Sequence, residues 1–195
     1  MDISQNETII NFFNDLGIDS GHTSHSLEQL VAADSRFLRD TKLNVTSVLG
    51  SSNMNKQEAY LLALSVAVNQ KHEVLTKAFE NLAKKEGASD AIIAEAHACT
   101  GVMNINNVFY RFRHYMDGIE YYDKQPAGLR MNVMMNPAMG KELFELMSLV
   151  ISAVNGCERC VISHENSVKQ HGASEARIFD AIRLAGVIKS LCVIF

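Results

Sequence analysis

The chain has 195 residues, of which 47% are hydrophobic and 21% are charged, and its formal net charge is −4. A chain of this length can bury a sizeable core and suits one or two compact units. The acidic net charge offers no basic surface for nucleic acid, so we expect no nucleic-acid partner. No apolar run reaches membrane-spanning length, and the N-terminus lacks the charged flank and apolar run of a signal peptide.

Hydrophobic spacing indicates a succession of helices with no run of strand alternation, so the predicted fold class is all-α. Gly17 ends the first helix, and the Gly50-Ser-Ser segment ends the second. Asn136-Pro137 is a strong helix start, because Asn caps well and Pro fits the first turn. Residues 118–130 are predicted to be loop. The predicted helices cover residues 5–16, 24–49, 55–69, 71–85, 89–116, 136–154, 155–171 and 174–191.

An internal repeat relates two parts of the chain. Residues 67–73 align with residues 153–159, and residues 87–90 align with residues 172–175 after a one-residue difference in length. The expected organisation is N-terminal helices in residues 1–50, a degenerate first repeat in residues 51–125 and a second repeat in residues 126–195, within one compact domain. In the first repeat, the positions that match Cys157, Cys160 and His164 are Lys71, Val74 and Ala78.

Four cysteines, Cys99, Cys157, Cys160 and Cys192, in a chain without a signal peptide fit a reducing cytoplasm better than a disulfide scaffold. In that compartment a Cys-x-x-Cys pair is catalytic or metal-binding rather than structural. Cys99 and Cys192 lie in apolar patterns and are predicted to fill the core.

The stretch from Asn155 to His164 carries the chemistry of the second repeat. If it is helical, Cys157, Cys160 and His164 share one face, because positions three and four apart are neighbours. Asn155 is the predicted cap, Glu158 completes a capping box, and residue 172 lies beyond the helix end. The cysteines then lie in the first two turns, where amide N–H groups and the helix dipole favour a thiolate. This is the geometry of a dithiol redox site.

Glu145 belongs to a polar stripe, with Ser148 and Ser152, on the otherwise apolar stretch before the motif. Two antiparallel helices joined by a short turn would bring Glu145 to the level of His164. A carboxylate at this place could orient the imidazole or take its proton. We therefore predict that Glu145 and His164 form a proton relay beside the two thiols.

These residues resemble the alkyl hydroperoxidase D (AhpD) family, the lipoyl-dependent peroxidase branch of the carboxymuconolactone decarboxylase-like superfamily. The resemblance is specific across residues 126–185 and weaker over residues 55–117. It is carried by Glu145, eleven intervening residues and Cys157-x-x-Cys160-x-x-x-His164, by Gly128-Leu-Arg-Met-Asn132, by Asn136-Pro137, and by the order of a degenerate and an active repeat.

The resemblance implies an all-helical subunit that assembles as a homotrimer and serves as a cytoplasmic antioxidant. It implies no bound cofactor. Electrons would come from dihydrolipoamide on a lipoylated 2-oxo acid dehydrogenase component. They would pass through a dithiol–disulfide cycle to a hydroperoxide or to a partner peroxiredoxin (AhpC).

The resemblance also implies residue roles. Cys160 would form the sulfenic acid, Cys157 would be the proton donor and resolving thiol, and Glu145 with His164 would complete the relay. The chain departs from the family at Arg159, where a second histidine is expected. A cation at this position could still favour a thiolate.

Three other interpretations stay open. Zinc could be held by the two cysteines and His164, with Glu145 as a fourth ligand, although these ligands would crowd onto one helix. The protein could be an adaptor that reduces a peroxiredoxin without reducing peroxide itself. A lactone-acid decarboxylase is less favoured, because that chemistry has no evident need for paired thiols. The methionines, including Met131, Met134 and Met135, are predicted to serve packing or subunit contact.

Overall fold

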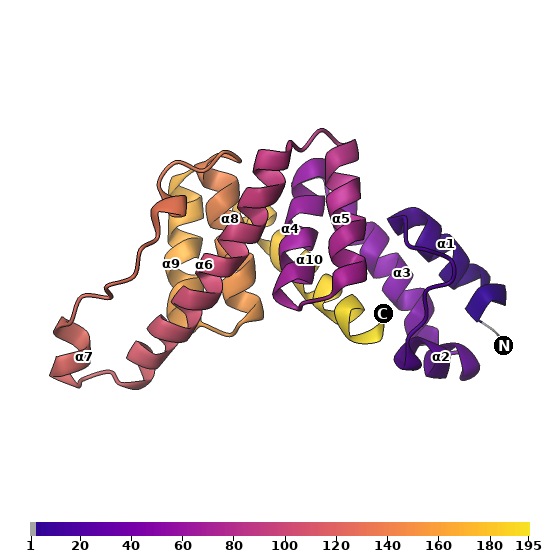
Figure 1. Cartoon of the computed structure of the whole chain (residues 1–195), viewed down its shortest axis with the longest axis horizontal. Helices are drawn as coiled ribbons and strands as arrows, with labels where there is room; N and C mark the ends of the chain where they lie inside the picture. The colour runs from indigo at the N-terminus through magenta and orange to yellow at the C-terminus, as the bar shows by residue number, and fades with distance from the viewer. Residues whose placement is uncertain (1–2) are drawn as a thin grey trace.

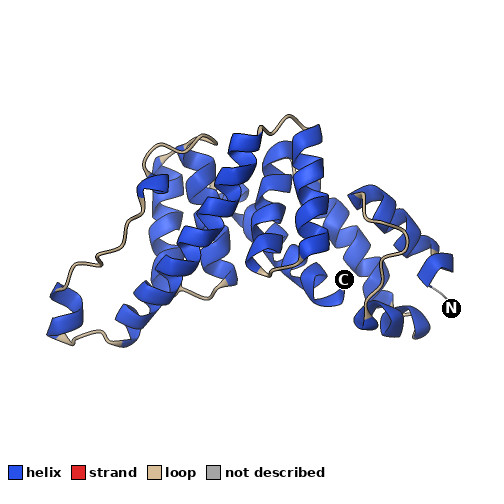
Figure 2. Ribbon diagram, in the orientation of Figure 1, coloured by secondary structure: helices blue, strands red, loops and turns tan. Residues whose placement is uncertain are grey.

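The computed structural model describes residues 3–195, and every regular element in that range is helical (Figure 2). The all-α prediction is confirmed. None of the helices in the described range is both long and apolar enough to cross a bilayer. The α-helices are α1 (Glu7–Leu16), α2 (His25–Ala32), α3 (Arg36–Leu49), α4 (Lys56–Asn69), α5 (Glu73–Lys85), α6 (Asp90–Tyr115), α7 (Glu120–Lys124), α8 (Lys141–Val154), α9 (Glu158–Gln170) and α10 (Glu175–Ile194). Two short 3₁₀ helices, η1 (Ile3–Gln5) and η2 (Asn132–Met134), complete this set.

Polar side chains start most helices where the sequence predicts. Asn55 and Glu58 form a reciprocal capping box at the start of α4, and Ser174 accepts the hydrogen bond of the Arg177 amide at the start of α10. Gly17 ends α1 with a left-handed φ of 67°, a conformation that glycine adopts without a steric penalty.

Two predictions about residues 24–49 and 118–130 are wrong. The helix expected over residues 24–49 is two helices, because the chain turns at Asp34, with φ at 45°, and Ser35 caps α3. The loop predicted over residues 118–130 contains the short helix α7. Local turn chemistry at Asp34 thus overrides a continuous apolar pattern.

The start predicted at Asn136-Pro137 is also wrong, since α8 begins at Lys141 after Gly140. The carboxylate of Glu95 on α6 accepts hydrogen bonds from the amides of Ala138 and Met139, each at 2.7 Å. These amides are therefore held by a side chain from another helix, and the segment stays a turn.

The helices form an elongated row in which α4 and α8 occupy the centre of two adjoining groups (Figure 1). α4 packs against α5, α6, α8 and α10, and α8 packs against α6, α9 and α10. Helices α1–α3 lie at one end, and α7 stands away from the body at the other. The end that carries α6, α8 and α9 holds the predicted redox residues.

The three helices of the first repeat and the three of the second begin at residue numbers that differ by one constant value. The residues that precede α4, α5 and α6 are Asn55, His72 and Ser89, and those that precede α8, α9 and α10 are Gly140, Cys157 and Ser174. The predicted register is therefore wrong by one residue around the motif. Cys157, Cys160 and His164 are matched by His72, Leu75 and Phe79, not by Lys71, Val74 and Ala78. Leu75 and Phe79 are fully buried, so the first repeat places core side chains where the second places its cysteine and histidine. The domain limits at residues 50 and 125 stay predictions.

Arg177 joins the two repeats through a partly buried ion cluster. Its guanidinium lies 2.9 Å from Glu58 on α4 and 2.8 Å from Glu142 on α8. Burial raises the pKa of Glu58, but the hydrogen bonds and charge of Arg177 and the hydrogen bond from the Asn55 amide outweigh it, so the net pKa is lowered. Removing one partner of such a cluster leaves the others desolvated without compensation.

We expect Arg177→Ala to lower the free energy of unfolding by roughly 2–3 kcal/mol, which is below the fully buried case because water reaches part of the cluster. Arg183→Ala is the matched control, since Arg183 is half-exposed and pairs only with side chains near the surface. Urea unfolding of both variants measures the effect. Equal stabilities would contradict a structural role for the cluster.

Candidate redox site

The turn between α8 and α9 places the two cysteines at the start of α9. Gly156 has a left-handed φ of 69°, which lets the chain reverse within two residues. Cys157 is the residue that caps α9, and Cys160 is the third residue of the helix. The predicted capping box is wrong, because Asn155 ends α8 and Glu158 is the first residue of α9.

Asn155 instead anchors the turn through a carboxamide network. Its side chain donates to Asn107 on α6 at 2.9 Å and accepts from Asn69 on α4 at 2.8 Å. Arg111 donates to its carbonyl oxygen at 2.7 Å, and Asn107 donates to the buried hydroxyl of Ser152 at 2.9 Å. Side chains of α4 and α6 thereby hold the residue two positions before Cys157, which restrains the turn that carries this cysteine.

Cys157 and Cys160 form a disulfide, with their Cα atoms 5.3 Å apart. The sulfurs are thus close enough to cycle between dithiol and disulfide. Cys157 is 1% exposed and Cys160 is 5% exposed, so both are sheltered from bulk solvent. They lie at the N-terminal end of α9, where the helix dipole favours a thiolate after reduction.

Glu145 and His164 lie together in the interior. The Nδ1 atom of His164 is 2.7 Å from Oε2 of Glu145, and the two side chains are 12% and 6% exposed. This confirms their predicted proximity, while their catalytic roles stay predictions. Burial raises the pKa of Glu145, but the hydrogen bonds and charges of His164 and Lys141 outweigh it, so the net pKa is lowered.

The contact with Glu145 involves Nδ1 of His164 and not Nε2. An ionised carboxylate only accepts hydrogen bonds, so Nδ1 must donate to Glu145. In the neutral imidazole the other nitrogen, Nε2, then carries the lone pair. This is the arrangement in which a carboxylate orients a histidine base.

Lys141 is a residue that the sequence analysis missed. Its ammonium lies 3.2 Å from Oε1 of Glu145 and donates to the carbonyl oxygen of Met134 at 2.7 Å. It therefore links the Glu145–His164 pair to η2. Its position four residues before Glu145 on one helix was the available signal.

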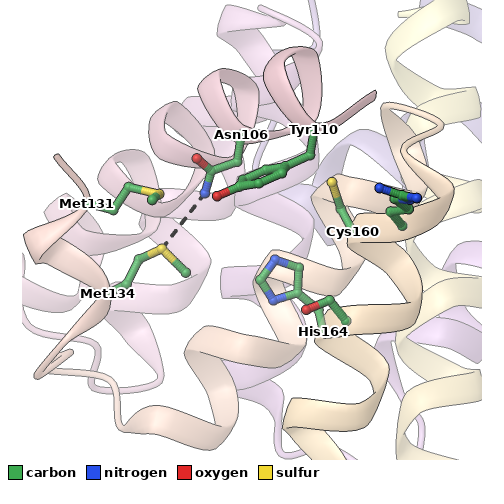
Figure 3. A pocket seen from close by; sticks show the side chains of 8 residues that line it. Asn106, Tyr110, Met131, Met134, Cys160 and His164 are labelled. Carbon is green, nitrogen blue, oxygen red and sulfur yellow. Dashed lines mark hydrogen bonds between the residues drawn. The ribbon is translucent and has the colours of Figure 1, made fainter. Parts of the chain in front are cut away.

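A cavity of about 360 Å³ opens beside Cys160 and His164 (Figure 3). α6, η2 with the residue before it, and α9 supply its walls. Cys160 lines this cavity and Cys157 does not, so Cys160 is the sulfur that a small molecule would meet. The lining residues are Asn106, Tyr110, Met131, Met134, Arg159, Cys160, Ser163 and His164. Asn106, Tyr110 and Ser163 carry no sequence signal of their own, and Met131 and Met134 were predicted to serve packing or subunit contact.

Arg159 lies at the cavity wall and forms an exposed ion pair with Asp117 at 3.3 Å. An exposed pair of this kind contributes little to stability. The structure therefore places a cation next to Cys160 in sequence and beside the same cavity. Its effect on the thiolate stays a prediction.

The remaining cysteines are separate from the redox pair. Cys99 is fully buried and Cys192 is partly buried, and burial raises the pKa of each thiol to about 12. Their predicted place in the core is confirmed for Cys99, and Cys192 packs at the edge of the core. Within residues 3–195, no group of three or more histidine, cysteine or acidic side chains is arranged to hold a metal ion.

Comparison with known proteins identifies the class to which this fold and site belong. The model of the Carboxymuconolactone decarboxylase family matches residues 121–192, the part that contains most of α7, all of α8 and α9 with the disulfide, and most of α10. The match covers the disulfide, Glu145 and His164 together. The matched region is thus the part of the chain that carries the sequence motif.

Relatives that span most of the chain narrow the assignment. An alkyl hydroperoxide reductase AhpD of Anaeromyxobacter dehalogenans is 42% identical over 80% of this chain and 82% of its own. Proteins of the same name from Streptomyces griseus and from a Bradyrhizobium species are each 38% identical, over 85% and 86% of this chain and 93% and 92% of theirs. The chain belongs to the AhpD family.

Proposed function

We propose that this protein is an antioxidant alkyl hydroperoxide reductase that works through a Cys157–Cys160 dithiol–disulfide cycle. The single observation that carries the proposal is the disulfide whose Cys160 end lines a cavity beside the Glu145–His164 pair. The names of the similar proteins support the same reaction.

In the peroxidatic half of the cycle, Nε2 of His164 takes the thiol proton of Cys160. The thiolate attacks the terminal oxygen of the hydroperoxide, the O–O bond breaks, and the alkoxide takes a proton from the imidazolium to leave as an alcohol. Cys160 is now a sulfenic acid. The thiol of Cys157 condenses with it, which releases water and forms the disulfide.

In the reductive half, a dithiol returns two electrons to the disulfide. One thiolate of dihydrolipoamide attacks Cys160 in the cavity, and Cys157 leaves as a thiolate; the second lipoyl thiol then releases oxidised lipoamide. The first repeat supports Cys157 as the leaving group. His72, at the position of Cys157, accepts a hydrogen bond from the amide of Leu75 at 3.2 Å. A Cys157 thiolate would meet the equivalent amide of Cys160.

The electron donor is, in this proposal, a lipoylated 2-oxo acid dehydrogenase component, and an AhpC-type peroxiredoxin is a further acceptor of electrons. The proposed location is the cytoplasm, as the family resemblance implies. No cofactor is needed within the chain, because the two sulfurs carry the electrons. The cavity beside Cys160 is small and partly apolar, so it suits a small hydroperoxide and the end of a lipoyl arm.

A homotrimer is the proposed assembly. Large apolar side chains lie exposed along the C-terminal part of α6, on α7 and in the segment after it, away from the packed core, and such surfaces are typical of subunit contacts. They include Val108, Phe112, Tyr115, Ile119, Tyr121 and Met135. Sedimentation equilibrium should give three times the mass of one chain, and a monomeric mass would contradict the assembly.

An adaptor that reduces a peroxiredoxin but not peroxide is the second candidate. The shelter of both sulfurs from solvent favours it, because a partner could dock over the cavity. A coupled assay separates the two. We expect hydroperoxide consumption driven by the dihydrolipoamide system without added peroxiredoxin. Consumption only when peroxiredoxin is present would make the protein an adaptor.

A further inference from the structure

Asn106 is a buried amide with poor hydrogen bonding in the wall of the Cys160 cavity. It lies on α6 and is 5% exposed. Its Oδ1 atom has no hydrogen-bond partner within residues 3–195, and Nδ2 donates only to the thioether of Met134, at 3.9 Å (Figure 3). A thioether is a weak acceptor, so neither end of the amide is well satisfied.

A buried polar group left in this state costs about 1–3 kcal/mol and calls for an explanation. The asparagine next to it shows the contrast, since Asn107 is fully bonded to Ser152 and Asn155. Asn106 therefore contributes little to the stability of the fold. A group retained at such a cost beside a reactive centre is typical of a functional role.

The surroundings of Asn106 indicate what it would bind. Tyr110, Met131 and Met134 give the cavity an apolar wall, and Cys160 with His164 forms the reactive side. The amide is thus a polar group on α6 that could bind an oxygen atom of a ligand in the same cavity as Cys160. The weak bond to Met134 is easily exchanged for one to a ligand oxygen.

We propose that Asn106 is a substrate-binding residue whose Nδ2–H donates to the departing oxygen of an alkyl hydroperoxide during attack by Cys160. The inference rests on the proposed peroxidase function. As the O–O bond breaks, negative charge develops on this oxygen, and a donor already in place stabilises it before His164 delivers the proton. The methionine and tyrosine side chains hold the alkyl group.

The test compares Asn106→Leu, which has a similar shape without polar atoms, with Asn106→Asp, which keeps acceptors and loses the donor. Asn166→Leu is the control, because Asn166 lies exposed on α9 and bonds only to its own helix. Stopped-flow kinetics follow oxidation of the reduced protein by cumene hydroperoxide and, separately, reduction of the disulfide by dihydrolipoamide. Thermal unfolding reports stability.

We expect both Asn106 variants to be oxidised about tenfold more slowly or worse, the value of one hydrogen bond to a charged group. Their reduction should stay within about twofold of the wild type, and Asn106→Leu should unfold at an equal or higher temperature. Wild-type oxidation rates in either variant would overturn the proposal. So would a loss of stability with both half-reactions slowed alike. If hydroperoxide does not oxidise the wild-type protein, the peroxidase function itself is refuted. The role of Asn106 is then decided by the binding of cumyl alcohol to the oxidised protein. An unchanged affinity for cumyl alcohol in Asn106→Leu would overturn the role of Asn106 in binding.

Discussion

Replacing Cys160 with serine should abolish hydroperoxide reduction, with a loss of at least about 10³-fold in turnover. Serine keeps the size of the side chain but offers neither a thiolate nor a sulfur that can reach the sulfenic state. Because Cys160 lines the cavity and Cys157 does not, the other thiol of the pair cannot meet the substrate in its place. The measurement is steady-state hydroperoxide consumption with dihydrolipoamide.

Cys157→Ser should behave differently and so identifies the order of events. Its Cys160 is expected to react once with hydroperoxide and to stop as a sulfenic acid, which dimedone traps and mass spectrometry locates. Cys99→Ser is the control, since this buried thiol has a raised pKa and lies outside the redox pair. Full steady-state activity in either Cys157→Ser or Cys160→Ser would rule out the dithiol cycle.

Glu145→Gln should lower the rate constant for oxidation of the reduced protein by about 100-fold, the low end for a general acid–base contribution. The amide keeps the shape and one acceptor but removes the charge that orients His164 and stabilises the imidazolium. The fold should persist, because the change is isosteric. Stopped-flow oxidation by hydroperoxide measures it.

The control for Glu145 is Glu165→Gln, a change at a partly exposed carboxylate on α9 that pairs with Lys169. It should leave the rate unchanged. An unchanged rate in Glu145→Gln would remove Glu145 from the relay, whatever its distance from His164.

The same variant tests the pH dependence of stability. The pKa of Glu145 in the folded protein lies below its ordinary value of 4.5, so the unfolded chain binds the proton more tightly. The carboxylate therefore stabilises the fold fully above pH 4.5, and this contribution is lost as pH falls through the folded pKa. Urea unfolding at several acidic pH values should show that Glu145→Gln lacks this loss. Parallel pH profiles for the two proteins would contradict it.

Much of the fold could be predicted because its signals are local. Apolar spacing, the caps at Asn55 and Ser174, and the glycine at position 17 depend on neighbouring residues, and the structure has helices there. One failure involves contacts between distant residues. The start of α8 is moved by Glu95, which lies over forty residues away in sequence and binds the amides of Ala138 and Met139.

The candidate site also contains some residues that local sequence signals predict and others that only tertiary packing brings together. The proximity of Glu145 and His164 follows from helical spacing and a short turn, so it could be predicted. Asn106 and Met134 could not, because α6 and η2 reach Cys160 only through tertiary packing. The error of one residue in the repeat arose because short sequence identities around Asn69 and Asn155 outweighed the helix starts, which only the structure shows.

The most direct test of the redox cycle is a thiol count on the reduced protein before and after one equivalent of alkyl hydroperoxide, in the absence of any partner. The account predicts rapid loss of two thiols per chain, one alcohol formed per chain, and a Cys157–Cys160 disulfide in the peptide map. Thiols that persist with hydroperoxide alone, or that are lost at Cys99 or Cys192, would contradict it.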